Sequence, residues 1–267
     1  MVRLLKIDFR KYFYSKVFWI MISVYAALLL MVFFGAEKFV NGVLANASTT
    51  APVTMPGFTL YSFPLVWQNL AFFAGFLKIF LALIVLFFIT NEFSNKTIRQ
   101  NIMNGMSRNQ FILSKLLFVV LLSLVSAAIL FASGLVLGFL YTDELTTALI
   151  LKKAVFIPAY FLEVLTFGIL AMLIAFLVQR SILAIGALAL YYYIIEPIIS
   201  SMLPDKYANY LPVEAIGNLI DIPNSALMQM FGVSFRENVS MQDAITCLIY
   251  CGFFTVLIFL FFRRKDI

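Results

Sequence analysis

The stretch NEFSNKTIRQNIMNGMSRNQFILSK, residues 91–115, is the one sizeable polar and basic segment of this chain that has long apolar runs on both sides. The flanking runs cover about residues 70–90 and 116–141. As helices, both are long enough to cross the roughly 30 Å hydrocarbon core of a membrane. We therefore expect a short loop in water that joins two membrane-spanning helices.

The composition places the whole chain in a membrane. Hydrophobic residues make up 63% of the 267 positions, charged residues only 12%, and the mean hydropathy is +1.01. These values exclude a water-soluble globular domain. The predicted fold is an all-α polytopic membrane protein with one transmembrane domain over residues 1–267. Its six predicted spans cover about residues 17–35, 70–90, 116–141, 154–178, 182–200 and 244–262.

An amphipathic segment precedes the first span. One face of it is basic, with Arg3, Lys6 and Arg10. The other face is apolar, with Leu5, Phe9, Tyr12 and Phe13. This pattern is typical of a helix that lies in the cytoplasmic membrane interface and leads into the first span as an elbow. An unstructured basic tail is the alternative interpretation.

The distribution of lysine and arginine predicts the orientation of the spans. With six spans both termini lie on one side, and that side then carries thirteen of the 19 basic residues. Basic residues are enriched in cytoplasmic loops, so the termini and residues 91–115 are predicted to be cytoplasmic. The net charge of +6 is explained by anionic membrane lipids, and no nucleic-acid partner is expected.

Residues 201–243, before the last span, are too apolar for a solvated loop. The segment contains three prolines, Pro204, Pro212 and Pro223, among apolar residues such as Leu211, Ile216 and Phe231. We expect short external helices that lie on or dip into the outer leaflet.

Two helices are predicted within residues 91–115. The first runs from about residue 96 to 104 and ends at Gly105, which suits a left-handed conformation. Ser107 and Gln110 fit a capping box that starts the second helix, which continues into the third span. Ile98 and Ile102 fall on one face of the first helix and form a small apolar ridge in a basic, amide-rich rim. This pattern favours a docking surface, and the alternative is a solvated helix whose charges only set the topology.

The order of residues in this loop resembles the first cytoplasmic loop of type-2 ATP-binding-cassette (ABC) permeases, of the type V exporter kind. In that family an acidic residue ends the second span, a threonine-containing helix couples to the ATPase, and a Ser-Arg pair leads into the third span. The matching residues here are Glu92, Thr97, Ile98, Arg99, Gly105, Ser107, Arg108, Phe111 and Lys115. The six-span layout, the elbow and the external helices also resemble the family.

This resemblance implies the membrane permease subunit of an ATP-driven exporter in a bacterial plasma membrane. It would work as a homo- or heterodimer with two copies of a cytosolic ATPase subunit. The chain has no G-x-x-x-x-G-K-[ST] loop to bind phosphates, so ATP hydrolysis is expected on the partner and not on this chain. The ATPase-coupling interface is expected at Glu92, Thr97, Ile98, Arg99, Ile102, Gly105 and Arg108.

Three ionisable residues, Lys78, Glu163 and Glu196, lie within predicted spans, where a charge is costly unless it is paired or hydrated. Lys78 and Glu163 both lie about 12–14 Å below the outer boundary at the helical rise per residue. They can therefore form an ion pair, and Glu196 is a competing partner nearer the outside. The pair is either a polar lining of the export path or a structural contact between helices.

No site for chemistry is expected. The chain has no histidine, and its two cysteines, Cys247 and Cys251, lie four residues apart within the last span. We therefore predict no metal site, no cofactor and no nucleophilic catalysis. Two alternatives to the permease remain: a secondary transporter that uses the three buried charges, and a non-transporting scaffold or immunity protein.

The predicted topology can be tested by labelling single cysteines with a membrane-impermeant reagent. Cysteines at Asn46 and Asp221 are expected to react from outside, whereas one at Asn101 is not. External labelling at Asn101 contradicts the orientation.

Overall fold

The computed structural model describes residues 12–48, 60–95, 97–103, 105–223, 236 and 238–264, and all regular structure in these residues is helical. The all-α prediction is therefore confirmed. The helices are α2 (Lys16–Ser48), α3 (Val66–Gly75), α4 (Lys78–Ser94), α5 (Thr97–Met103), α6 (Arg108–Tyr141), α7 (Thr147–Leu151), α8 (Phe156–Val178), α9 (Ser181–Leu190), the π-helix η1 (Tyr191–Ile195), α10 (Glu196–Met202), α11 (Asp205–Ala208), α12 (Pro212–Gly217) and α14 (Met241–Arg264).

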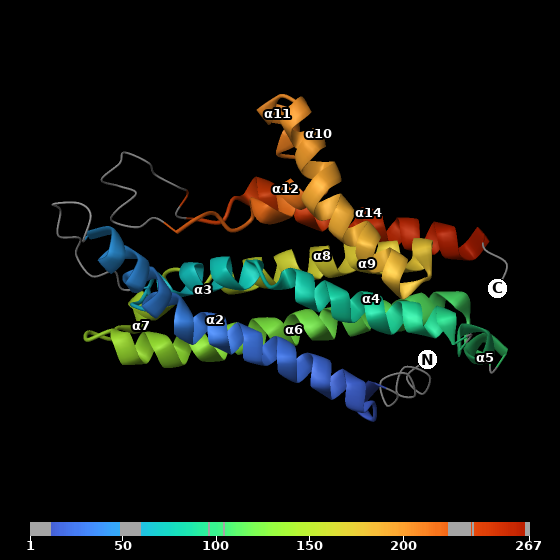
Figure 1. Ribbon diagram of the computed structural model, residues 1–267, viewed down its shortest axis with the longest axis horizontal. Helices are drawn as coiled ribbons and strands as arrows, with labels where there is room; N and C mark the ends of the chain where they lie inside the picture. The colour runs from blue at the N-terminus through green and yellow to red at the C-terminus, as the bar shows by residue number, and fades with distance from the viewer. Residues whose placement is uncertain are drawn as a thin grey trace.

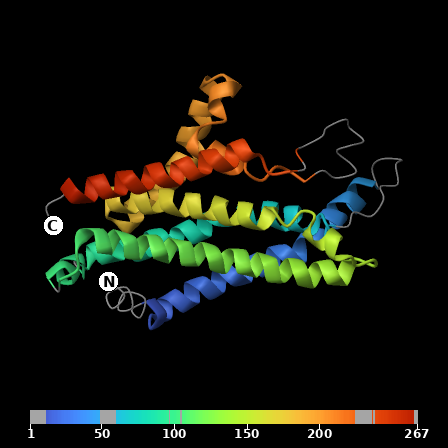
Figure 2. The same cartoon turned by 180° about the vertical axis from the view of Figure 1, so that it is seen from behind.

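Six stretches of these helices correspond to the six predicted spans. Five are long and apolar enough to cross a membrane, and the pair α3 and α4 makes the sixth if the two count as one bent span. The start of α2, α5 and the end of α14 lie at the same end of the bundle in both views (Figure 1, Figure 2). We call this the inner end and the opposite one the outer end. The start of the first span and the end of the last span on one side agree with an even number of spans.

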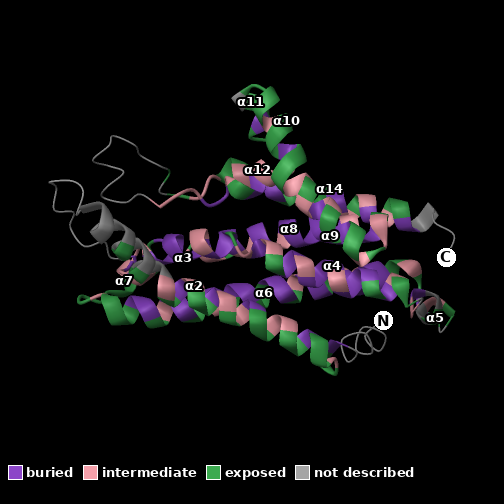
Figure 3. Ribbon diagram, viewed as in Figure 1, coloured by how far each residue is buried: buried purple, intermediate pink, exposed green. Residues whose placement is uncertain are grey.

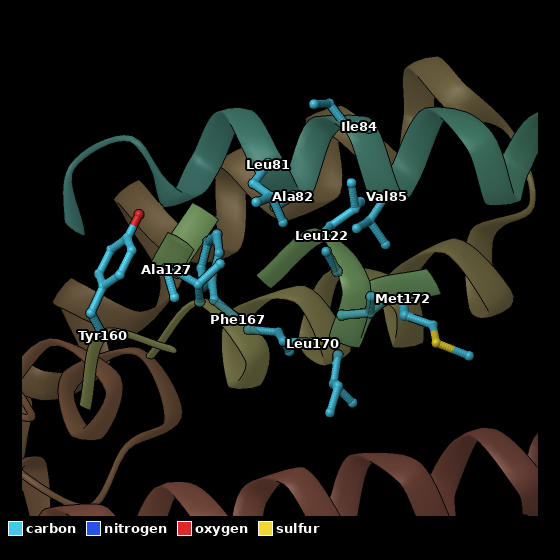
Figure 4. Close-up of a cluster of buried hydrophobic side chains, with 14 of the residues drawn as sticks. Leu81, Ala82, Ile84, Val85, Leu122, Ala127, Tyr160, Phe167, Leu170 and Met172 are labelled. Carbon is cyan, nitrogen blue, oxygen red and sulfur yellow. The ribbon is translucent and has the colours of Figure 1, made fainter. Parts of the chain in front are cut away.

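The core is built around α8, which packs against α4, α6 and α14. Figure 4 shows Leu81 and Val85 of α4 close to Leu122 of α6, with Phe167 and Leu170 of α8 beside them, and all five are buried. In Figure 3, α8 is mostly buried along its length, whereas the outer surfaces of α2 and α14 are exposed. The fourth span is thus the central helix of the bundle, and its apolar residues on every face fit that position.

The second span is not the single straight helix predicted over residues 70–90. It begins at Val66, breaks after Gly75 and resumes at Lys78, with a bend of 47°. An added Cβ at Gly75 would lie 3.0 Å from Glu163 Oε1, so the glycine lets the carboxylate approach the break. The sequence pattern missed this break because both halves are equally apolar.

The fifth span contains a local irregularity before Pro197. The five-residue π-helix η1 lies between α9 and α10, and α10 then runs on to Met202. Proline removes one backbone donor, and a π-turn is one way in which a helix accommodates that loss. Beyond η1, α10 and α11 project from the bundle (Figure 1), and Tyr193 and Met202 are exposed.

The expectation of short helices before the last span is confirmed by α11 and α12. α12 packs against α14 and α8. The amphipathic elbow falls almost wholly outside the described residues. Only its last two residues, Tyr12 and Phe13, are described, and both are helical.

Two glycines on α6 let aromatic side chains near the start of the second span pack closely. An added Cβ at Gly134 would lie 2.5 Å from Trp67 Cζ3, and one at Gly138 would overlap the ring of Phe63. Trp67 also donates a hydrogen bond of 2.7 Å to the carbonyl of Ile150, next to α8. Small residues four apart are a common way to bring membrane helices together, and here they accept aromatic rings.

Replacing Gly138 with alanine is therefore expected to destabilise the bundle by about 1–3 kcal/mol, because the new methyl group overpacks against Phe63. Gly186→Ala is the matched control. Gly186 lies in α9 with nothing within 4 Å of an added Cβ, so there alanine is expected to be neutral or stabilising. Thermal unfolding in detergent measures both variants, and equal melting temperatures for the two contradict the close approach.

Candidate coupling site and buried charges

The helix α5 lies between α4 and α6 at the inner end, as the sequence predicted. Gly105, which follows it, has φ of +93°, a conformation that side chains other than glycine rarely adopt. The capping box at the start of α6 is present: Ser107 Oγ accepts from the Gln110 amide, and the Gln110 side chain accepts from the Ser107 amide. These two features fix the turn between α5 and α6.

The exposed face of α5 differs from the predicted one. Ile98 is only 3% exposed and packs in the hydrophobic core, and Ile102 is partly buried against it. The expectation of an exposed ridge at Ile98 was therefore wrong. Met103 is 77% exposed, so it is the apolar side chain that α5 presents to its surroundings. The side chain of Arg99 lies outside the described part of the chain.

Glu92, at the end of the second span, lies in a buried polar cluster. Lys115 Nζ lies 2.9 Å from Glu92 Oε1 and 2.8 Å from Oε2, and it donates a 2.8 Å hydrogen bond to the Tyr12 hydroxyl. The Tyr12 hydroxyl in turn donates to Glu92 Oε1 at 2.9 Å. Lys115 has no exposed surface, and Glu92 is 4% exposed. We call Tyr12, Glu92 and Lys115 the inner cluster.

The inner cluster joins α5 to several spans. Thr97 Oγ1, in the first turn of α5, donates to the Glu92 carbonyl at 3.2 Å. The Lys115 ammonium lies 4.8 Å from the centre of the Phe111 ring, and that ring stacks on Phe262 of α14 at 5.6 Å. Cation–π contact and stacking therefore extend the cluster from the second and third spans to the sixth.

A pocket of about 170 Å³ lies beside the inner cluster. It is lined by Tyr12, Ser15, Phe88, Asn91, Glu92, Asn95 and Thr97. Its walls therefore come from the start of the first span, the end of the second span and the start of α5.

Lys78 and Glu163 form the ion pair that their matched depth predicted. Lys78 Nζ lies 2.7 Å from Glu163 Oε1, and the two residues are 6% and 3% exposed. Lys78 is the first residue of α4, directly after the break in the second span, and Glu163 lies on the central helix α8. The pair therefore joins the broken span to the core of the bundle.

Hydroxyl groups link further spans through the buried Ser126. Ser126 Oγ of α6 lies 2.7 Å from the Tyr25 hydroxyl of α2 and 2.7 Å from the Tyr160 hydroxyl of α8. Tyr25 and Tyr160 are also buried. These hydrogen bonds fix the middle of the first span against the third and fourth.

Glu196 does not compete for Lys78, so that prediction was wrong. Its Oε1 accepts hydrogen bonds from the backbone amides of Val213 and Glu214, in the first turn of α12. The first amides of a helix lack partners within the helix, and a carboxylate satisfies them well. Glu196 therefore fixes an external helix to the fifth span, a role that only the folded chain reveals.

At the outer end, Arg236 ties the segment after α12 to the last span. Its guanidinium lies 2.6 Å from Asp243 and 3.4 Å from Asp221. The hydrogen bond with Asp243 is the main cause that raises the pKa of Arg236 above its usual value. Gln68 of α3 donates to the Arg236 carbonyl at 3.4 Å and accepts from Lys153 at 3.1 Å. The second span is therefore part of this external network.

Sequence reasoning missed the roles of Lys115 and Tyr12. Lys115 matched the loop motif but was not assigned a contact, and Tyr12 was assigned to the apolar face of the elbow. The position of Lys115 directly before the apolar run at 116–141 gives no separate signal, because lysines commonly flank spans on the cytoplasmic side. No pattern near Tyr12 points to partners 80 and 103 residues away.

The Lys78–Glu163 contact predicts strongly non-additive substitutions. Lys78→Met or Glu163→Gln alone leaves one buried group without its partner and is expected to cost about 3–5 kcal/mol, whereas the double variant is expected to lose less than the sum. Unfolding of the four proteins in mixed micelles measures the coupling. If the two single losses add up in the double variant, the residues are not in contact.

Comparison with known proteins agrees with this architecture. The family model described as ABC-2 family transporter protein matches residues 2–267. No curated protein matches the chain. Because the family model covers nearly the whole chain, the protein belongs to the ABC-2 transporter family and is a multi-pass membrane permease subunit of an ABC transporter.

Proposed function

We propose that this permease subunit exports its substrate by coupling, through α5, to ATP hydrolysis on a cytosolic partner. An ABC-2 permease implies a transporter with an ATPase partner. In the proposed assembly two permease subunits, identical or different, form the path and two ATPase subunits bind at their inner ends. The membrane is proposed to be a bacterial plasma membrane, with α5 on its cytoplasmic side.

The placement of α5 is the observation that carries this proposal. It is a short helix at the inner end, bonded to the end of the second span through Thr97 and followed by the capping box that starts the third span. Its exposed surface includes Gln100 and Met103. A partner that binds a protruding helix of this kind can move the spans without entering the membrane.

Ile98 contributes to coupling in a different way from the one predicted. Because it is buried, it fixes α5 to the bundle, and the contact with the ATPase falls to the exposed side. Glu92 and Thr97 act from within in the same way, through the inner cluster. Gly105 sets the turn, and Arg108, in the first turn of α6, lies close enough to the turn to meet a carboxylate of the ATPase.

For Lys78 and Glu163 we propose a structural role. The pair is almost fully buried within one subunit, and it lies at the break of the second span. A secondary transporter that uses Lys78, Glu163 and Glu196 as one centre is disfavoured, because Glu196 has its own partners on α12. The pair is therefore proposed to hold the two halves of the second span at their bend.

Docking at α5 predicts a specific loss of the ATPase. Met103→Asp places a charge in the contact and is expected to lower the amount of co-purified ATPase about tenfold, because a desolvated charge without a partner costs more than 1 kcal/mol. The permease itself should still insert and fold, since Met103 is exposed. Quantitative pull-down with the partner ATPase measures the effect.

Asn109→Asp is the matched control, because it adds the same charge at an exposed position in the first turn of α6. It should retain most of the ATPase. If the Met103→Asp protein retains as much ATPase as the Asn109→Asp protein, the ATPase does not bind this face of α5. The proposed coupling then fails.

A further inference from the structure

A phenolic hydroxyl forms hydrogen bonds between the start of the first span and the residues that flank α5. Tyr12 lies before α2, yet its hydroxyl contacts Glu92 at the end of α4 and Lys115 in α6, which flank α5 in the chain. Three segments that are far apart in sequence therefore meet at one buried oxygen atom.

Tyr12 is firmly connected to the first turns of α2. The Ser15 amide donates to the Tyr12 carbonyl at 3.0 Å, and Trp19 Nε1 donates to the Phe13 carbonyl at 2.8 Å. The Phe18 ring lies 6.2 Å from the Tyr12 ring. Any displacement of Tyr12 is therefore passed to the start of the first span.

The first span has few other attachments. Only 22% of its apolar part is buried, compared with 67% for the fourth span. In Figure 2 α2 crosses the bundle at an angle rather than lying parallel to α6. Its midpoint is held through the Tyr25 hydroxyl. At its inner end the Phe18 ring packs 5.6 Å from Phe88 and 6.0 Å from Phe118, and the Tyr12 hydroxyl adds a polar contact with the inner cluster.

Resting on the proposed docking of the ATPase at α5, we propose that Tyr12 is a positioning residue that passes movements of α5 directly to the first span. The route runs from Thr97 through the Glu92 carbonyl and carboxylate to the Tyr12 hydroxyl. Lys115 keeps the carboxylate and the hydroxyl in contact by bonding to both. The ATPase then moves the first and third spans together, from the two sides of one cluster.

The phenylalanine variant isolates the hydroxyl. The Tyr12 ring stacks on Phe118 at 4.4 Å and meets Phe88 edge-on at 5.4 Å, and both contacts remain possible in Tyr12→Phe. The Glu92–Lys115 ion pair also remains. The substitution therefore disconnects α2 from the cluster without removing the packing.

The test is hydrogen–deuterium exchange of the full chain assembled with its ATPase, without nucleotide and with ATP and vanadate. In the unmodified complex, nucleotide is expected to change exchange both in residues 16–25 of α2 and in residues 108–118 of α6. In Tyr12→Phe the response of residues 108–118 should remain. The response of residues 16–25 should shrink about fivefold or more, the equilibrium effect of one lost net hydrogen bond.

Ser181→Ala is the matched control. Its hydroxyl lies 2.7 Å from Thr90 Oγ1 and joins α9 to α4, so its removal breaks a hydrogen bond between spans without touching the cluster. Both responses should survive in this variant.

Three outcomes overturn the proposal. The first is that exchange in residues 16–25 does not respond to nucleotide in the unmodified complex. The second is that this response is equally large in Tyr12→Phe. The third is that residues 16–25 and 108–118 both lose their response in Tyr12→Phe. The last result shows that the hydroxyl only holds the loop in its fold. Failure of the ATPase to bind at α5 is recognised separately, from the pull-down of the Met103→Asp protein, and contradicts the docking rather than the route.

Discussion

A charged group that leaves water inside a bilayer must find its partner within the protein, and this constraint shapes the whole chain. Lys78 and Lys115 are both buried, and each lies within 3 Å of a glutamate on another helix. Breaking such a pair costs more than its net contribution to stability, so each pair specifies one arrangement of spans more than it strengthens it. One pair lies at the bend of the second span, and the other lies at the junction at the inner end.

Apolar packing alone would leave the arrangement less well defined. Every span offers an apolar surface to lipid, and lipid tails solvate such surfaces as well as another helix does. The specific contacts are therefore polar or depend on close approach. The Tyr25, Ser126 and Tyr160 hydroxyls join three spans, and Gly134 and Gly138 admit two aromatic rings that no other residue would allow so close.

Much of this fold could be predicted from the sequence because its determinants are local. Span length, the capping box at Ser107 and the turn at Gly105 each depend on a few neighbouring residues, and equal depth was enough to pair Lys78 with Glu163. The break after Gly75 could not be predicted, because both halves of the span are apolar and the carboxylate that approaches Gly75 lies 88 residues away.

The same limit applied to the candidate site. The helix α5 and its place in the chain were predicted, but its exposed face was not, because a seven-residue helix gives too short a pattern to show which side packs on the bundle. Glu196 was assigned to the wrong partner because α12 returns to the fifth span only in the folded chain. The Tyr12 contacts span 80 and 103 residues and leave no local pattern.

The Lys78–Glu163 pair also constrains how the protein is made. The two residues are 85 positions apart, so at about 5–20 residues per second the ribosome delivers the glutamate roughly 4–17 s after the lysine. During this interval the second span carries an uncompensated ammonium group at the break between its two apolar halves. The nascent span must then wait at the insertion machinery, or sit shallow with its lysine reaching toward head groups, until the fourth span emerges. Integration of this protein is therefore a cooperative event between non-neighbouring helices, timed by translation.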